Sequence, residues 1–206
     1  MHRRPEDWLR EEYFVLLPHV RQVILDLETR IRYELLPLMA DLKKFERIVI
    51  TSRIKDCESA FTTLQEKQEA FVFDPIRGGT YTLTDLRDLA GVRVLAFPRK
   101  RWLEANDILR AAFSSWESRP MPDPVSGSPL VHKYNGYCSS TDQVRAEVQI
   151  SPMLIGQFLD VEHSAIYKPL PELEGAKPLM REHINSVFSA LQAFDAELER
   201  LIQETL

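Results

Sequence analysis

The sequence feature that most constrains the fold is a short apolar run at residues 91–97, which reads GVRVLAF. It begins with glycine, is followed by Pro98 and contains a single charged side chain, that of Arg93. Strands with one solvated face alternate between apolar and polar residues, whereas strands covered on both faces read as nearly continuous apolar runs. We therefore expect this run to form a central strand of a sheet that other elements cover.

Two further segments predict strands, and two predict loops. Residues 144–150 alternate, which gives an apolar face of Val144, Ala146, Val148 and Ile150 and a polar face of Arg145, Glu147 and Gln149. Residues 47–54 contain a run of β-branched residues, which is also typical of a strand. Prolines, glycines and serines in segments 71–81 and 114–128 predict exposed loops.

Apolar residues at helical spacing predict several helices. The first covers about residues 5–42, as one long helix or as a helix interrupted near Pro18 and Pro37. Shorter helices are expected at about residues 57–70, 102–113 and 153–167, and Thr84 is expected to cap a turn that runs into Asp88. The last helix, at about residues 178–204, has an expected core stripe of Ile184, Val187, Leu191, Phe194, Leu198 and Leu201.

Size and charge limit the classes of protein that fit. At 206 residues the chain suits one domain with helical extensions. The formal net charge of -5 argues against a surface built as a whole to bind a nucleic-acid backbone, and two cysteines are too few for a disulfide framework. The sequence shows no signal peptide and no stretch near the roughly 20 apolar residues of a membrane-spanning helix. We expect a cytoplasmic protein without a membrane partner.

Two acidic residues stand out beside the expected strands. Asp88 comes just before the apolar strand, and Glu147 lies on the polar face of the alternating strand. If these strands pair, the two carboxylates can hold Mg²⁺, which in phosphoryl-transfer sites binds one or two carboxylates, water and substrate phosphates. The alternative for each acid alone is a solvated charge or a helix cap.

Other side chains suit phosphate binding. Arg53, Lys55 and Arg93 lie near strand ends, where they can bind polyphosphate oxygens or form surface salt bridges. Ser59 can bind a phosphate or cap the helix that follows Cys57. The sequence contains no glycine-rich phosphate loop, dinucleotide fingerprint or nucleophile elbow, which disfavours the common nucleotide folds.

Aromatic and helical polar residues form a second group. Tyr134 and Tyr137 lie on either side of an Asn-Gly pair that predicts a turn, where a ring can stack on a nucleobase or cover the sheet edge. His163 and Tyr167 lie four residues apart and therefore share one face of an expected helix. A single helical histidine is more often structural than catalytic.

Four segments connect these residues in chain order. They read RIKDCES at 53–59, DLAGVR at 88–93, VRAEVQI at 144–150 and VEHSAIYK at 161–168. Together they resemble the synthetase domain of the RelA/SpoT family, whose small members make the alarmone (p)ppGpp. The resemblance extends from about residue 47 to residue 168, with flanking helices where the family has them.

The resemblance implies a role for each matching residue. The residues expected to bind ATP are Arg53, Lys55, Ser59 and Arg93, from the R-x-K-(x)3-S and D-x-x-G-x-R segments. The expected metal-binding and catalytic acids are Asp88 and, from the E-x-Q segment, Glu147. The residues expected to bind the acceptor are Tyr134, Tyr137, Gln149, His163, Tyr167 and Lys168.

The resemblance also implies a fold and a reaction. The fold is an α/β (α+β) mixed β-sheet flanked by helices, related to nucleotidyltransferases, in a single domain. Residues 1–46 would form a helical extension, 47–168 the catalytic core and 169–206 a C-terminal helix. In the implied reaction the ribose 3′-hydroxyl of GDP or GTP attacks the β-phosphate of ATP, AMP is released, and Mg²⁺ is the cofactor.

The acceptor region departs from the family pattern. Family members usually carry G-Y-R-S-x-H at the start of a strand that precedes the E-x-Q strand, and GYCS at 136–139 matches only part of it. An alternative alignment makes residues 129–134 this preceding strand and residues 135–143 its hairpin loop. Ser151 stands where the family commonly continues with arginine.

The departures keep two other functions open. One is a toxin-type relative that transfers pyrophosphate to an adenine nucleotide or to the 3′ end of tRNA. The other is a degenerate nucleotide-binding or interaction module, which could form a homo-oligomer through the long terminal helices.

Overall fold

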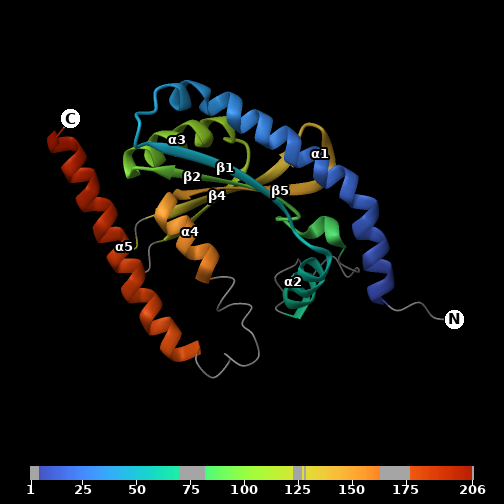
Figure 1. Cartoon of the computed structure of the whole chain (residues 1–206). Coiled ribbons are helices and arrows are strands. Elements are labelled where there is room, and N and C mark those ends of the chain that lie inside the picture. The colour runs from blue at the N-terminus through green and yellow to red at the C-terminus, as the bar shows by residue number, and fades with distance from the viewer. Residues whose placement is uncertain (1–4, 70–81, 123–126, 128, 163–176, 206) are drawn as a thin grey trace.

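The computed structural model describes residues 5–69, 82–122, 127, 129–162 and 177–205. Its helices are α1 (Pro5–Ala40), α2 (Cys57–Glu69), α3 (Arg99–Ala112), α4 (Met153–Glu162) and α5 (Lys177–Thr205), with a short 3-10 helix at Leu83–Asp85. Its strands are β1 (Arg47–Ile54), β2 (Ala90–Phe97), β3 (Glu117–Pro122), β4 (Pro129–Cys138) and β5 (Thr141–Pro152). Figure 1 shows the strands together in one layer, with α1 and α3 above it and α4 below it.

The five strands form one mixed sheet in the order β1-β2-β5-β4-β3. β2 and β5 run parallel, and all other neighbouring strands are antiparallel. β2 therefore lies inside the sheet, as the apolar run at residues 91–97 predicts. The mixed sheet with its helices confirms the expected α+β fold class.

One face of the sheet packs against α1 and α3. The sheet buries a continuous apolar set there: Ile48, Ile50, Val92, Val94, Val144, Ala146, Val148 and Ile150. The matching stripe of α1 includes Val20, Val23, Leu27, Ile31 and Leu35, all buried. Their spacings of three and four residues place them on one side of a helix, so α1 forms because it covers the sheet.

The opposite face of the sheet is polar. The strand register places Arg53, Gly91, Glu147, Asn135 and Glu117 in one row across the five strands. The next row contains Thr51, Arg93, Gln149, Lys133 and Arg119. Residues two apart along a strand share a face, so both rows belong to one surface, which we call the open face.

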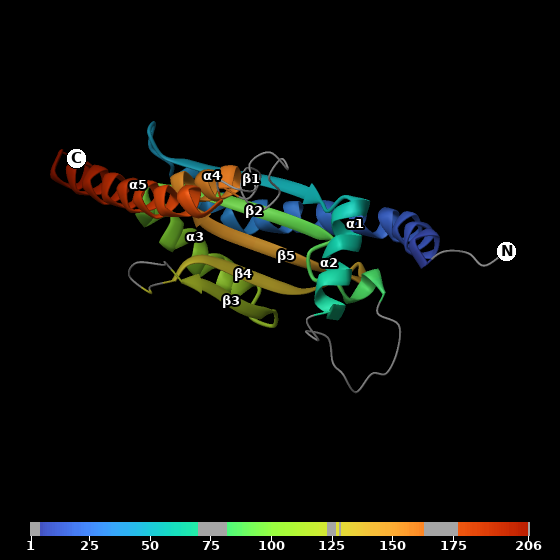
Figure 2. The same cartoon turned by 90° about the horizontal axis from the view of Figure 1, so that it is seen from below.

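Helix α4 covers only one end of the open face, where it packs on β2 and β5. Gly156 comes so close to β2 that a Cβ added to it would lie 2.3 Å from Leu95 Cδ2 and 2.5 Å from Ser151 Oγ. Seen from below, β2 and β5 run from the end of the sheet near α2 toward α4 (Figure 2). α4 packs at Leu95 and Ser151, which follow the polar rows along β2 and β5. The polar rows therefore lie between α4 and α2.

The expectation of an exposed loop over residues 114–128 is wrong in part, because Glu117–Pro122 forms β3. β3 is an edge strand that pairs only with β4. Proline cannot donate a ladder hydrogen bond, but an edge strand has one side without a neighbour and so tolerates it. Pro120 and Pro122 therefore occur in a strand although the composition predicts a loop.

The alternative hairpin loop at residues 135–143 is also wrong. β4 continues to Cys138, β5 begins at Thr141, and only two residues connect the strands. Gly136 is needed inside β4, since a Cβ there would lie 2.4 Å from Cδ2 of Trp116. An Asn-Gly pair that local rules place in a turn thus lies in a strand because a distant ring packs on it.

For the helices, the structure selects one of the two alternatives for α1 and changes the expected cap. α1 is one helix across Pro18 and Pro37. Thr82 rather than Thr84 precedes the short 3-10 helix, and its N–H donates to Asp85 Oδ2 at 2.9 Å. No helix among the described residues is both long and apolar enough to span a bilayer.

The core stripe expected for α5 is wrong in part. Val187, Phe194 and Leu201 are exposed, whereas Phe188 and Asp195 are buried. α5 packs against α3 and α4. Its buried side therefore lies one position further round the helix than the apolar periodicity predicts.

Candidate functional site

Asp88 and Glu147 line the same cavity, of about 700 Å³, between the open face of the sheet and α2. Three cationic residues, Arg53, Lys55 and Lys133, and the helix residue Ser59 line it with them. Asp88 lies two residues before β2, and Glu147 lies on β5, which pairs with β2 as the sequence predicts. Three further acids, Asp56, Glu58 and Glu66, also line the cavity. Asp88 and Glu147 beside the three cations of the sheet are a set of groups suited to polyphosphate chemistry.

The sheet register places these groups. Arg53 lies opposite Gly91 in the β1–β2 ladder, and Gly91 lies beside Glu147 in the β2–β5 ladder. A Cβ on Gly91 would lie 3.4 Å from Arg53 Cγ. Glycine at this position leaves room for the arginine to extend across the strand toward Glu147.

Lys55 and Asp88 are held together where β1 ends and β2 begins. The Lys55 N–H donates to the Leu89 carbonyl oxygen at 3.0 Å, which extends the ladder by one residue beyond Ile54. The Lys55 Nζ then donates to Asp88 Oδ2 at 2.7 Å, and Arg53 Nη2 lies 3.9 Å from the same oxygen. The carboxylate is thus fixed on one of its two oxygens.

Helix α1 supports this corner from behind. The Tyr13 hydroxyl donates to the Lys55 carbonyl oxygen at 2.8 Å, and Glu12 Oε1 accepts from the Leu83 N–H at 3.1 Å. Burial raises the pKa of Glu12 above its ordinary value. Two adjacent residues of α1 therefore anchor the segment that carries Lys55 and the segment that leads to Asp88.

The charge of Asp88 is stabilised by its neighbours. Burial alone would raise the pKa of Asp88, but the ion pair with Lys55, together with Lys67 and Arg53, lowers it below the ordinary value. The carboxylate is therefore ionised at neutral pH. The same desolvation lowers the pKa of Lys67, which Asp88 partly restores.

One oxygen of Asp88 is placed to receive a cation. Asp88 Oδ1 is buried and has no hydrogen-bond partner among the described residues, while Oδ2 accepts from Lys55. A buried carboxylate oxygen without a partner is costly unless a ligand satisfies it. Asp88 and Glu147, two hard oxygen donors on one cavity, fit Mg²⁺, which takes few protein ligands. The described residues contain no cluster of three or more His, Cys, Asp or Glu side chains that would hold a metal without substrate.

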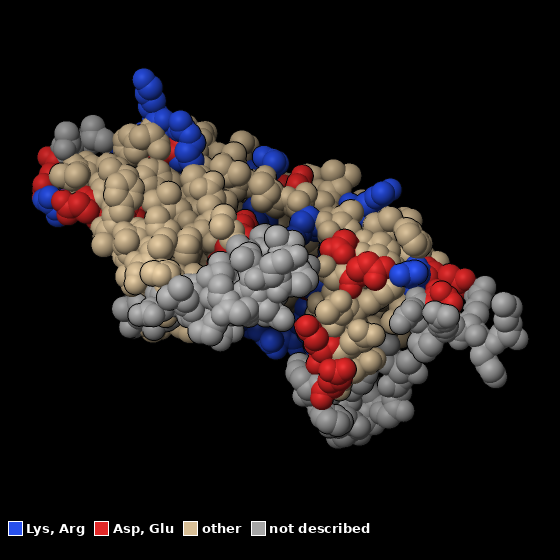
Figure 3. Space-filling model, turned by 60° about the horizontal axis from the view of Figure 1, so that its bottom comes forward, with Lys and Arg blue, Asp and Glu red and all other residues tan. Residues whose placement is uncertain are grey.

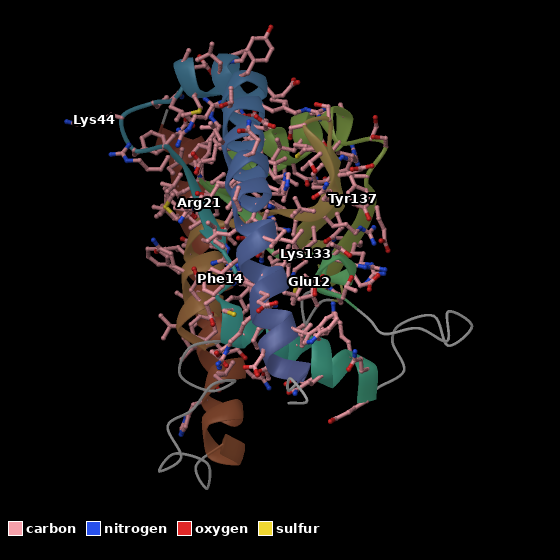
Figure 4. The ribbon with its side chains drawn as sticks, turned by 90° about the vertical axis from the view of Figure 1, so that its right-hand side faces the viewer. Glu12, Phe14, Arg21, Lys44, Lys133 and Tyr137 are labelled. Carbon is pink, nitrogen blue, oxygen red and sulfur yellow. The ribbon has the colours of Figure 1, made fainter. Side chains whose placement is uncertain are left out.

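Lys133 is a site residue that the sequence patterns do not reveal. Its Nζ lies 3.5 Å from Glu147 Oε1 across the β4–β5 ladder, and it lines the cavity. Alternation along β4 places Lys133 on the same face as Val131 and Tyr137. The sequence does not reveal this alternation when residues 135–143 are taken as a loop. Figure 4 shows Lys133 and Tyr137 at separate points along β4.

A smaller cavity of about 220 Å³ adjoins the first and shares Arg53 and Glu147 with it. It is lined by Arg93, Gln149 and Asp160 among others. Arg93 donates to Gln149 Oε1 at 3.3 Å and forms an ion pair with Asp160 of α4. The arginine expected to bind ATP and the glutamine expected to bind the acceptor are therefore in contact, and a carboxylate missed by the sequence patterns accompanies them.

Tyr134 cannot stack on a nucleobase in this structure. Its side chain is 1 % exposed and faces α3, where its hydroxyl donates to Asn106 Oδ1 at 2.9 Å and its ring stacks on Phe113. Alternation along β4 puts Tyr134 on the covered face and Lys133 on the open face. The expectation that Tyr134 binds the acceptor is therefore wrong.

The remaining acceptor residues divide into two groups. Tyr137 is 49 % exposed near the end of β4, with the Arg145 guanidinium 5.5 Å from its ring centre, and lines neither cavity. His163, Tyr167 and Lys168 lie outside the described residues. Among the expected acceptor residues that the structure describes, only Gln149 lines a cavity.

Comparison with known proteins shows the fold of the chain. No protein-family model matches the sequence, and no curated protein matches it. Among solved structures, the small alarmone synthetase 1 from Bacillus subtilis bound to its product pppGpp has 17% sequence identity and a TM-score of 0.64, over 97% of this chain and 98% of that one. The chain has the fold of a small alarmone synthetase.

Two other structures agree with this fold. The Bacillus subtilis synthetase bound to AMPCPP has 21% identity and a TM-score of 0.59, over 97% of this chain and 100% of that one. A GTP pyrophosphokinase family protein from Streptococcus pneumoniae has 24% identity and a TM-score of 0.53, over 99% and 97%. Each of these likenesses spans at least 97% of this chain and at least 97% of the solved chain.

Proposed function

We propose that this chain is a RelA/SpoT-type pyrophosphotransferase that moves the β,γ-pyrophosphate of ATP onto the ribose 3′-hydroxyl of GDP or GTP. The observation that carries the proposal is the shared cavity of Asp88 and Glu147, which Arg53, Lys55 and Ser59 also line. The small-alarmone-synthetase fold supports it, since solved proteins of this fold are bound to pppGpp and to AMPCPP.

The proposed reaction is a single displacement. The 3′-oxygen of the acceptor forms a bond to the β-phosphorus of ATP, and the bond from that phosphorus to the oxygen bridging the α- and β-phosphates breaks. The bridging oxygen leaves with AMP. The proton of the 3′-hydroxyl passes to the carboxylate of Glu147. Glu147 lies beside Gly91 in the β2–β5 ladder and lines the cavity.

The other residues act on the charge of the phosphates. Arg53 and Lys55 bind phosphate oxygens and neutralise the charge that develops on them, and Ser59 donates a hydrogen bond from the start of α2. Asp88 and Glu147 would hold Mg²⁺, which when bound polarises the phosphoryl group. Lys133, whose Nζ lies 3.5 Å from Glu147 Oε1, holds that carboxylate in place beside the cavity.

Product analysis tests the proposal. The protein is incubated with ATP, Mg²⁺ and GDP or GTP, and AMP and the 3′-pyrophosphorylated guanine nucleotide are measured. We expect both products in equal amounts, their loss on chelation of the metal, and their return when Mg²⁺ is added. Release of no AMP with any acceptor would contradict the proposal and favour a binding module without turnover.

A second acceptor class is favoured by one observation. Tyr134 is buried and Tyr137 lines neither cavity, so the described residues provide no aromatic ring on the cavities for guanine to stack on. The same transfer to an adenine nucleotide or to the 3′ end of tRNA is therefore the alternative. Parallel incubations with ADP, ATP alone and tRNA distinguish these acceptors by which one receives the label from [β-³²P]ATP.

A further inference from the structure

Three arginines converge on one carboxylate beside the catalytic cavity. Glu117 of β3 lies 3.0 Å from Arg87, 2.6 Å from Arg119 and 3.8 Å from Arg145. These residues come from the segment before β2, from β3 and from β5, so the tertiary fold assembles them. We call this set of four residues the arginine cluster. Figure 3 shows Lys and Arg side chains gathered toward the middle of this side of the molecule.

The arginine cluster carries more positive charge than its own acid balances. Three guanidinium groups surround a single carboxylate, which leaves an excess of two positive charges. Arg145 Nε is buried and has no hydrogen-bond partner among the described residues. Burial lowers the pKa of Lys67, the attraction of Asp88 opposes this, and repulsion from Lys55, Arg87 and Arg119 adds to the lowering. Such a group of forked donors matches phosphate geometry.

The register fixes how far the arginine cluster lies from the reacting groups. Glu117, Asn135 and Glu147 are direct neighbours in one row, so two strand spacings, about 10 Å in total, separate Glu117 from Glu147. This matches the reach of one nucleotide from its 3′-oxygen to its 5′-phosphates. The proposed ATP residues Arg53, Lys55 and Ser59 lie on the other side of Glu147, on β1 and α2.

We propose that the arginine cluster binds the 5′-phosphates of the acceptor nucleotide, with Arg119 and Arg145 as the main ligands and Glu117 as the resident counter-ion. The inference rests on the proposed function and narrows it, because it selects a mononucleotide 5′-di- or triphosphate over the 3′ end of an RNA. A nucleotide with its 3′-oxygen at Glu147 then lies along β5 and β4 with its phosphates at β3. Glu117 is 38% exposed in its side chain and can turn to water when phosphates arrive.

The first experiment varies the number of phosphates on the acceptor. KM is measured for GMP, GDP and GTP at saturating ATP in the wild type, Arg119→Gln and Arg145→Gln. We expect the wild type to prefer GTP and GDP, and each variant to raise the GTP KM about tenfold while changing the GMP KM little, because each loses one charge-assisted hydrogen bond. The KM for ATP stays the same. Arg110→Gln is the matched control, since this arginine is exposed and forms an ion pair with Asp107 within α3.

A second variant separates binding from a structural role of the arginine cluster. Glu117→Gln removes the resident counter-ion, so it should lower the GTP KM severalfold, whereas loss of a purely structural network would raise it or leave it unchanged. A GTP KM in Glu117→Gln at or above the wild-type value would overturn the proposal. So would equal KM values for GMP and GTP in the wild type, or efficient transfer to RNA 3′ ends that Arg145→Gln leaves intact.

Direct binding distinguishes failure of this inference from failure of the proposed reaction. Calorimetry with GTP and GMP alone needs no turnover. If no acceptor yields AMP but GTP binds more tightly than GMP and Arg145→Gln removes the difference, the pyrophosphotransfer proposal fails and the phosphate site stands. If transfer occurs and calorimetry shows no dependence on phosphate number, the phosphate site fails and the reaction stands.

Discussion

The two faces of the central sheet use the same strands for different purposes. On the covered face, Val92, Val148 and Ile150 are buried against α1 and α3. On the open face, their immediate neighbours Arg93, Glu147 and Gln149 line the two cavities. Alternation along a strand separates the two sets by a single residue. Within one short segment, some residues therefore stabilise the core and the residues between them line the cavities.

This separation depends on strand register. A shift of one residue would move Arg145 and Glu147 into the core and would move Val144, Ala146, Val148 and Ile150 to the open face. The burial of Val144, Ala146, Val148 and Ile150 against α1 and α3 opposes such a shift. Packing of the core thus fixes the position of Glu147, although Glu147 lies on the open face. Substitutions on the covered face should change stability, and substitutions on the open face should change activity.

The largest effect is expected on the open face. Asp88→Asn should lower the rate of AMP formation about a thousandfold, roughly 4 kcal/mol in the barrier, because the amide is a weak metal ligand and does not balance Lys55. The free energy of unfolding should change little, which urea denaturation measures. Asp107→Asn, an exposed acid of α3, is the control and should keep full activity. Loss of stability as large as the loss of activity would break the comparison between faces.

The next effect belongs to the covered face. Ile150→Ala should lower the free energy of unfolding by about 2–5 kcal/mol, because it leaves a cavity in a core where Ile150 is fully buried. The rate per folded molecule should stay near that of the wild type, measured below the unfolding transition. Val49→Ala on the half-exposed edge of β1 should cost much less. A fall in activity without a fall in stability would show that the two faces are coupled.

Tyr134→Phe tests on which face a single tyrosine belongs. Removal of the hydroxyl that donates to Asn106 should cost about 1 kcal/mol of unfolding free energy. The KM for the acceptor should not change, since the ring faces α3. An increase in the acceptor KM with unchanged stability would return Tyr134 to the acceptor site.

The smallest effect is expected from the ion pair between Arg93 and Asp160. Asp160 is half exposed, so its replacement by asparagine should free Arg93 for the nucleotide and tighten binding of AMPCPP by only a few-fold. Calorimetry in low salt measures this change. In an Arg93→Gln background the same substitution should have no effect, and a full effect there would place Asp160 in direct contact with the nucleotide.

Much of the fold follows from short-range patterns. The apolar run at 91–97 and the alternation at 144–150 predict β2 and β5, and helical spacing predicts the helices within a few residues. The misses share one cause. Pro120 lies in β3 because the edge of the sheet tolerates proline, and Gly136 lies in β4 because the Trp116 ring packs on it. Both positions are set by tertiary contacts and not by local preference.

The site follows the same division. Asp88 and Glu147 were expected to face one cleft, and they line one cavity, while their roles remain proposals. Lys133 and Asp160 were not foreseen, because neither belongs to a pattern that distinguishes it from a surface charge. Tyr134 was expected at the acceptor site but lies on the covered face of the sheet. An error of one residue in the position of a strand places a side chain on the opposite face.

The sequence by itself determined the helices, the strands β1, β2 and β5, and which residue types can hold a metal and phosphates, because these depend on spacing within a few residues. Only the tertiary structure decided that Arg87, Arg119 and Arg145 meet at Glu117 and that Tyr134 turns toward α3. Such contacts depend on the order and register of strands that are distant in the chain, and burial of the whole core sets that register.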